Sequence, residues 1–214
     1  MDKVIVVLPA YNEEKTVGKV IDEIRLLGLG YDILVVDNNS TDKTAEIAKA
    51  RGVQYLFVKE QGKGCAISKG FKSVSGTTVI MDSDYTYPAA YIPALVGSLK
   101  EYDVVLGWRK YKDPGAMTST NSIGNYLLTK LANLLYGTHI HDVCTGMWAF
   151  RDVRPLVIES KGFTLEPEML IQARRYGWKI GEVSIHYRAR EGTSKLNIFD
   201  GFKIGSYFLR ERLR

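Results

Sequence analysis

The sequence predicts an α/β fold in which a mostly parallel sheet is flanked by helices. Short β-branched apolar runs alternate with segments whose apolar residues recur at helical spacing. Polar or glycine-rich loops follow these runs, as in parallel sheets whose strands end at a ligand crevice. No linker, repeat or low-complexity segment divides the 214 residues, so one domain is expected.

The first half of the chain follows this alternation closely. Strands are expected at 4–8, 33–36, 54–58 and 77–81. Each is short and apolar, which is typical of strands buried on both faces. The first helix is expected to begin at Asn12 as N-cap, with Glu13 and Glu14 in its first turn, and to end before Gly28. Further helices are expected at 42–51 and from 64 onward.

The second half is less regular. Helices are expected at 91–102, 123–136, 166–176 and 196–214, and strands at 104–106, 143–150 and 179–187. Residues 110–120 are polar and contain Gly and Pro, which predicts a loop. On the helix at 123–136, the apolar residues lie along one broad arc: Ile123, Leu127, Leu131, Leu134 and Leu135. Three polar residues lie elsewhere: Asn125, Thr129 and Asn133.

The last segment, 196–214, has the pattern of an amphipathic helix. Its apolar side carries Ile198, Phe199, Phe202, Leu209 and Leu213. The opposite side carries Asp200, Lys203, Arg210 and Arg214. Such a helix can pack on its own domain, or lie on a membrane with its cations on lipid phosphates.

The composition is that of a soluble globular protein, with 45% hydrophobic and 25% charged residues. No run approaches eighteen apolar residues, and the start of the chain has no leader pattern, so neither a transmembrane helix nor a signal peptide is expected. Cys65 and Cys144 match no zinc or redox spacing and fit a reducing cytosol, although a disulfide between them is compatible with the sequence. The net charge of +5 permits an anionic partner without selecting one.

Two carboxylates, Asp82 and Asp84, directly follow the apolar run at 79–81. In an extended chain they point to the same side. Carboxylates aimed at one point repel each other unless a cation lies there, and Mg²⁺ or Mn²⁺ prefers such oxygen ligands. An ordinary acidic turn is the alternative. The loops at 9–14, 37–42 and 62–64 and the acid pair are expected at four successive strand ends, on one rim of the sheet. Together they suit a nucleoside diphosphate.

These loops carry a resemblance to a known family. The motifs are residues 8–14 (LPAYNEE), 35–42 (VVDNNSTD), 62–66 (GKGCA), 81–84 (MDSD), 107–109 (GWR), 142–146 (DVCTG) and 190–196 (REGTSKL). In this order they resemble the family 2 glycosyltransferases with the GT-A fold, and within them the dolichol-phosphate sugar synthases. The match spans nearly the whole chain. The first four motifs indicate the superfamily, and the last three indicate the polyprenyl-phosphate branch.

The resemblance implies roles for individual residues. The expected donor-binding residues are Pro9, Tyr11, Glu13, Asp37, Lys63, Gly64 and Asp82, with Asp37 on the base. The expected metal ligands for Mg²⁺ or Mn²⁺ are Asp82 and Asp84. Asp84, Arg109 and Lys195 are expected to be catalytic. The expected acceptor-binding residues are Arg109, Asp142, Arg190, Ser194 and Lys195.

The resemblance also implies an activity, which is the inverting transfer of a sugar from a UDP- or GDP-sugar to a polyprenyl (dolichyl) phosphate. Residues 1–109 would form the nucleotide-sugar half and 110–214 the acceptor half. The protein is expected to be peripheral on the cytoplasmic face of a membrane, with helix 196–214 as a possible membrane contact. No nucleic-acid partner is expected. Because an acceptor phosphate has a second pKa of about 6, it is already anionic at pH 7 and needs cations rather than a general base.

Two positions depart from the family pattern. The usual Asp-Asp-Gly-Ser is Asp37-Asn38-Asn39-Ser40 here, where Asn keeps hydrogen-bonding capacity and tolerates the left-handed conformation. The usual Thr/Ser-Gly-Phe-Arg is 145–148 (TGMW), so an acceptor-phosphate contact is expected to move to Arg151 or elsewhere.

Three other functions fit parts of the pattern. A soluble family 2 glycosyltransferase would act on a saccharide hydroxyl and would need a base, for which Asp142, Glu166 and Glu168 are available. A nucleotidyltransferase would release pyrophosphate, but the loop at 9–14 lacks the glycines and cations such enzymes usually show. A non-catalytic nucleotide-sugar-binding module would show no turnover.

Overall fold

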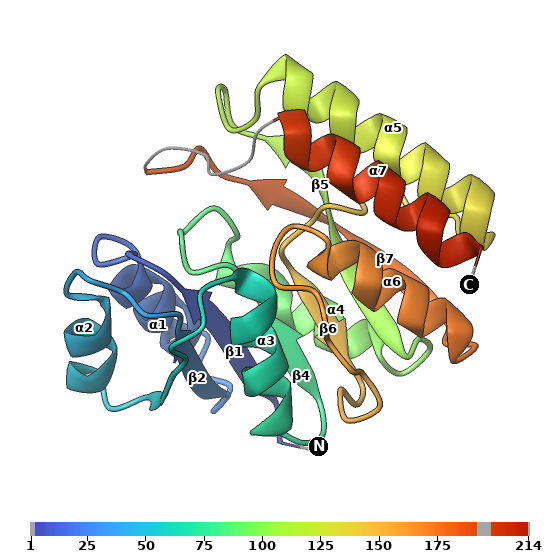
Figure 1. Ribbon diagram of the computed structural model, residues 1–214. Coiled ribbons are helices and arrows are strands. Elements are labelled where there is room, and N and C mark those ends of the chain that lie inside the picture. Colours follow the sequence, from blue (N-terminus) through green and yellow to red (C-terminus); the bar gives the residue numbers. More distant parts are fainter. Residues whose placement is uncertain (1–2, 192–197, 214) are drawn as a thin grey trace.

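The computed structural model describes residues 3–191 and 198–213, and one seven-stranded sheet runs through them (Figure 1). The strands are β1 (Ile5–Ala10), β2 (Asp32–Asp37), β3 (Gln54–Phe57), β4 (Thr78–Ile80), β5 (Val104–Lys112), β6 (Trp148–Phe150) and β7 (Ile180–Tyr187). Their order is β3-β2-β1-β4-β6-β5-β7. β6 is antiparallel to both its neighbours, and the other pairs are parallel. The predicted fold class, an α/β fold with a mostly parallel sheet, is confirmed.

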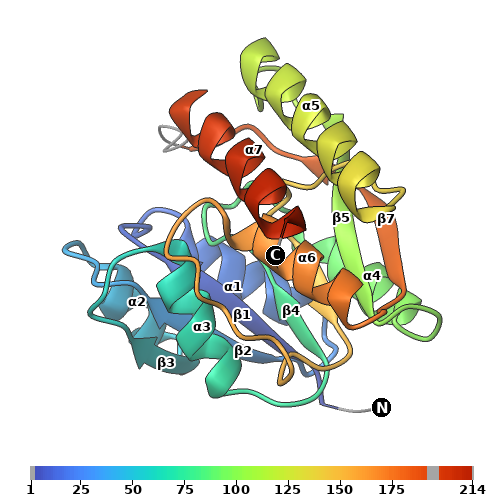
Figure 2. The same cartoon turned by 45° about the vertical axis from the view of Figure 1, so that its right-hand side comes forward.

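Helices cover both faces of this sheet (Figure 2). One face is covered by α3 (Lys63–Lys72), α5 (Ser119–Tyr136), α6 (Leu165–Arg175) and α7 (Ile198–Arg212). The other is covered by α1 (Val17–Leu26), α2 (Thr44–Ala50), the 3₁₀ turn η1 (Ala89–Tyr91) and α4 (Ile92–Ser98). Successive residues of β1 enter opposite cores, since Val7 packs in one and Val6 in the other. This explains why the strand is apolar throughout.

Several element boundaries differ from the expected ones. Helix α1 begins at Val17, and Asn12 has a left-handed φ of 55°, so Asn12 is not its N-cap. Strand β5 continues to Lys112 because it pairs with β7, and α5 begins at Ser119, so the loop between them is only 113–118. Strand β6 contains only three of the eight residues expected at 143–150, and Cys144 in the segment before it lines the cavity described below.

Helix α5 turns polar residues toward the protein. Asn125, Thr129 and Asn133 lie four residues apart, and each hydrogen-bonds the segment 138–144. Part of the apolar arc therefore faces outward, and Ile123 and Leu134 are exposed. Residues 138–144 carry backbone groups that need partners, and polar side chains supply them.

Helix α7 packs on α5 and α6, with Ile204 and Phe208 buried. Neither residue was on the predicted apolar side. Asp200, which was expected opposite the apolar side, is buried, while Phe202 and Leu209 are exposed. The helix therefore packs on its own domain and still presents apolar side chains to solvent.

Candidate active site

The loops at the carboxyl ends of β1 and β2 are held together by hydrogen bonds. The Asn12 backbone N–H donates to Ser40 Oγ (3.0 Å), and the Thr41 N–H donates to Asn12 Oδ1 (2.8 Å). Asn39 has a φ of 62°, which is the left-handed conformation that Asn was expected to tolerate at this position. Asn38 Oδ1 accepts from the Gly62 N–H (2.6 Å), which ties in the loop before α3. These contacts bring three of the predicted motifs to one rim.

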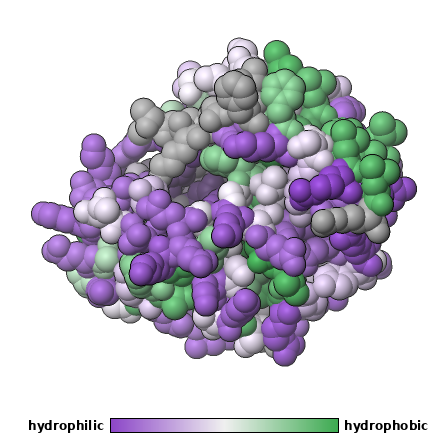
Figure 3. Space-filling model, in the orientation of Figure 1, coloured by the Kyte–Doolittle hydropathy of each residue, from purple (hydrophilic) through white to green (hydrophobic). Residues whose placement is uncertain are grey.

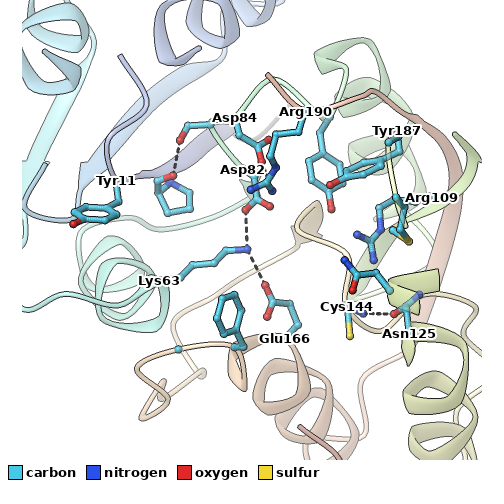
Figure 4. Close-up of a pocket in the computed structure, with 18 of the residues that line it drawn as sticks. Tyr11, Lys63, Asp82, Asp84, Arg109, Asn125, Cys144, Glu166, Tyr187 and Arg190 are labelled. Atoms are coloured by element: carbon cyan, nitrogen blue, oxygen red, sulfur yellow. Dashed lines mark hydrogen bonds and ion pairs between the residues drawn. The ribbon is translucent and has the colours of Figure 1, made fainter. Parts of the chain in front are cut away.

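A cavity of about 790 Å³ opens beside this rim (Figure 4). Eight of the residues expected in the site line it: Pro9, Tyr11, Glu13, Lys63, Asp82, Asp84, Arg109 and Arg190. Gly64 follows the lining residue Lys63 in the chain, and Asp142 accepts a hydrogen bond from the lining residue Arg109. The Asp37 carboxylate is buried and accepts from Tyr55 Oη (2.7 Å) and the Ser40 N–H (3.1 Å). Ser194 and Lys195 fall outside the described residues.

Both carboxylates of the acid pair face the cavity, and each holds a cationic side chain. Lys63 Nζ lies 2.7 Å from Asp82 Oδ1 and 2.8 Å from Glu166 Oε1. Arg190 Nη2 lies 2.5 Å from Asp84 Oδ2. Burial by itself lowers the pKa of Lys63, but the two carboxylates outweigh burial and raise that pKa, so the ammonium stays charged.

The space around Asp82 depends on a glycine. A Cβ at Gly146 would overlap the Asp82 carboxylate, and the Gly146 N–H donates to Tyr87 Oη (2.6 Å). Asp84 is held differently, because its Oδ1 accepts from both the backbone N–H and the hydroxyl of Thr86 (3.1 and 2.5 Å). One oxygen of Asp84 is therefore fixed, and the other faces the cavity.

The carboxylate oxygens of Asp82 and Asp84 fit a hard divalent cation. Carboxylate oxygens are the ligands that Mg²⁺ and Mn²⁺ prefer, and both ions usually keep ligand positions for phosphate and water. Among the described residues no three His, Cys, Asp or Glu side chains form a metal cluster. Asp82 and Asp84 would therefore hold such an ion only with oxygen atoms of a bound diphosphate or of water.

The opposite wall carries a buried ion pair. Arg109 Nε and Nη2 each lie 2.7 Å from a carboxylate oxygen of Asp142, and Asn125 Nδ2 also donates to Asp142 (2.9 Å). Burial by itself lowers the pKa of Arg109, but Asp142 outweighs burial and raises it, so the guanidinium stays protonated. Beyond this pair the cavity continues between α5 and α7, where Leu128 and Ile204 line it.

Some residues of the site were missed or misplaced by the sequence analysis. Tyr87 and Asn125 had no role assigned, and no local motif marks them. Glu166, named only as a possible base, holds Lys63 instead. Arg151 lies at the opposite end of the strands from the cavity, where it contacts Leu99, Tyr102 and Asp103. Strand β6 is antiparallel to its neighbours, so the residue that follows it points away from the cavity end of the sheet.

A mostly parallel sheet with an acid pair at its rim is the arrangement expected of a glycosyltransferase with the GT-A fold. The chain belongs to the family described as glycosyl transferase family 2, whose model matches residues 5–153. It is 36% identical over 221 residues to a dolichyl-phosphate hexose transferase of Haloferax volcanii, covering 100% of this chain and 97% of that protein. It is 31% identical to a dolichol-phosphate mannosyltransferase of Pyrococcus furiosus, covering 91% of this chain and 59% of that protein.

A solved structure shares the fold. It is glucosyl-3-phosphoglycerate synthase of Mycobacterium tuberculosis in complex with Mn²⁺ and UDP-glucose, with a TM-score of 0.72 and 25% sequence identity. The likeness covers 98% of this chain and 78% of that one.

Proposed function

We propose that this glycosyltransferase moves a sugar from a UDP- or GDP-sugar to a polyprenyl phosphate such as dolichyl phosphate, with inversion and with Mg²⁺ or Mn²⁺. The observation that carries the proposal is one cavity that runs from the acid pair to the space between α5 and α7, where the apolar side chains of Leu128 and Ile204 line it. We assign the nucleotide-sugar half to residues 1–109 and the acceptor half to 110–214.

The donor half supports the diphosphate part of the proposal. Asp82 and Asp84 would hold the divalent cation, which when bound neutralises charge developing on the leaving nucleoside diphosphate. Lys63 and Arg190 lie beside the same carboxylates and supply further positive charge there. The fold neighbour that binds Mn²⁺ and UDP-glucose supports this arrangement.

The acceptor half supports a phosphate nucleophile. An anionic phosphate oxygen attacks the anomeric carbon, and the bond from that carbon to the diphosphate oxygen breaks. No base is needed, and two available bases are already engaged: Glu166 by Lys63 and Asp142 by Arg109. A polyprenyl chain would leave the cavity past Leu128 and Ile204, between α5 and α7. The alternative is a soluble phosphorylated acceptor, which the fold neighbour's name favours.

The acceptor class is decided by a product panel. The enzyme is incubated with Mn²⁺, radiolabelled UDP-glucose, UDP-N-acetylglucosamine or GDP-mannose, and either dolichyl phosphate or 3-phosphoglycerate. We expect label in the lipid-extractable fraction with one donor, and nucleoside diphosphate as the released product. Label only in water-soluble product would refute the lipid acceptor. A parallel incubation with a nucleoside triphosphate and a sugar 1-phosphate tests for a nucleotidyltransferase, and pyrophosphate release there, without release of nucleoside diphosphate from the labelled donors, would refute glycosyl transfer.

We also propose that the enzyme rests on a lipid surface through α5 and α7, on the cytoplasmic side. Exposed apolar residues gather over these two helices (Figure 3): Ile123, Tyr126, Leu127, Leu134, Phe202, Leu209 and Leu213. Exposed Lys130, Lys203 and Arg210 flank them and would meet lipid phosphates. In the part of the chain that the structure describes, no helix is long and apolar enough to cross a bilayer.

Binding to vesicles tests this surface. We expect the protein to sediment with vesicles of phosphatidylcholine and phosphatidylglycerol, and the double variant Leu134→Ser/Phe202→Ser to sediment about tenfold less, because it loses two exposed apolar contacts. Leu26→Ser is the matched control, because Leu26 is 85% exposed but lies on α1. Equal sedimentation of the double variant and the wild type would contradict the assignment.

A further inference from the structure

The carboxylate of Asp84 is the most enclosed part of the acid pair, and its cavity-facing oxygen already has a partner. Its side chain is 7% exposed, and the Arg190 side chain is 27% exposed. The Arg190 guanidinium therefore lies where a cation bound to Asp84 would lie.

We propose that Arg190 competes with the divalent cation for Asp84 and thereby couples metal binding to donor binding. The inference rests on the metal site of the proposed function. In the empty enzyme, Arg190 neutralises Asp84 and weakens the binding of metal alone. When a nucleoside diphosphate arrives with the metal, Arg190 moves to the diphosphate.

Charge balance explains this coupling. The described side chains of Asp82, Asp84 and Glu166 form an ion-paired cluster with Lys63 and Arg190, and Glu13 is a further carboxylate on the cavity wall. A doubly charged nucleotide-sugar alone would add negative charge beside these carboxylates, whereas a nucleotide-sugar and a divalent cation together add no net charge. With the cation on Asp84, the Arg190 guanidinium loses its partner there, and the diphosphate offers it another.

Arg190 can move without its backbone moving. The residues on either side of it are anchored to α1: Arg188 Nη2 lies 2.7 Å from Glu23, and Glu191 lies 2.6 Å from Lys19 Nζ. The Arg188 guanidinium also lies 4.4 Å from the centre of the Tyr85 ring. These contacts hold the chain at the edge of the cavity, which both Ala189 and the long side chain of Arg190 line.

Isothermal titration with Mn²⁺, with and without saturating UDP or GDP, tests the coupling. For the wild type we expect the nucleotide to tighten Mn²⁺ binding at least tenfold, and Mn²⁺ to tighten nucleotide binding by the same factor, as linkage requires. For Arg190→Gln we expect Mn²⁺ to bind the nucleotide-free enzyme about tenfold more tightly than it binds the wild type, and nucleotide binding to weaken. A merely structural role of Arg190 would not produce tighter metal binding.

Two variants separate the possible outcomes. Arg51→Gln removes an arginine that also pairs with an aspartate, Asp22, but lies outside the site, and it is expected to match the wild type. Asp84→Asn is expected to lose Mn²⁺ binding with or without nucleotide. Unchanged or weaker Mn²⁺ binding to nucleotide-free Arg190→Gln would overturn the competition and leave the metal site standing. Wild-type Mn²⁺ binding by Asp84→Asn would overturn both the competition and the metal assignment.

Discussion

Replacing Asp84 with alanine is expected to lower kcat/KM for sugar transfer by about 10³-fold, because the metal that stabilises the leaving diphosphate loses a ligand. The variant is expected to stay folded. The two hydrogen bonds lost to Thr86 cost about 3 kcal/mol, and the Arg190 side chain, which is partly exposed, can turn to solvent. Turnover at saturating Mn²⁺ and the urea unfolding midpoint are the two measurements.

The control for this variant is Asp22→Ala. Asp22 also pairs with an arginine, Arg51, but the pair lies on the outside of α1 and α2. Its removal is expected to leave turnover unchanged. Wild-type turnover in Asp84→Ala would remove the metal assignment, and loss of the folded state would be seen separately in the unfolding curve.

Replacing Arg109 with glutamine is expected to destabilise the protein by about 3–5 kcal/mol, because it leaves the buried Asp142 carboxylate without its cation. Both side chains are almost fully buried, at 7% and 3% exposure. The double variant Arg109→Gln/Asp142→Asn replaces the ion pair with two neutral amides. It is expected to recover a large part of the loss, because no buried charge remains. Urea unfolding followed by circular dichroism gives both values.

Arg154 supplies a matched comparison, since it also binds an aspartate, Asp152, through two nitrogens but lies at the surface. Arg154→Gln is expected to change stability little. If Arg109→Gln were no more destabilising than Arg154→Gln, the structural role given to the Arg109–Asp142 pair would be wrong. The catalytic role predicted for Arg109 stays a prediction, and a KM for acceptor measured on folded Arg109→Lys tests it.

Much of the nucleotide end was predictable because its signals are local. The strand ending at Asp82 and Asp84 and the loops at 9–14 and 37–42 are each marked by an apolar run followed by polar residues. In a parallel sheet, strand ends meet at one edge, so these side chains had to come together. The structure places Pro9, Tyr11 and Glu13 on the same cavity as the acid pair.

The acceptor end was less predictable. The direction of β6 is set by its antiparallel pairing with β4 and β5. Because of this direction, Gly146 lies against Asp82, and Arg151 lies at the opposite end of the strands from the cavity. The inward face of α5 is set by the backbone groups of residues 138–144, which needed the polar side chains of that helix. A hydrophobic pattern does not contain either fact.

The sequence by itself determined the α/β class, the order of its elements and the acids at the strand ends, because each is written in short stretches of neighbouring residues. Only the tertiary structure decided which cations meet those acids. Lys63, Glu166 and Arg190 come from separate elements, and long-range packing alone brings their charges within reach of Asp82 and Asp84.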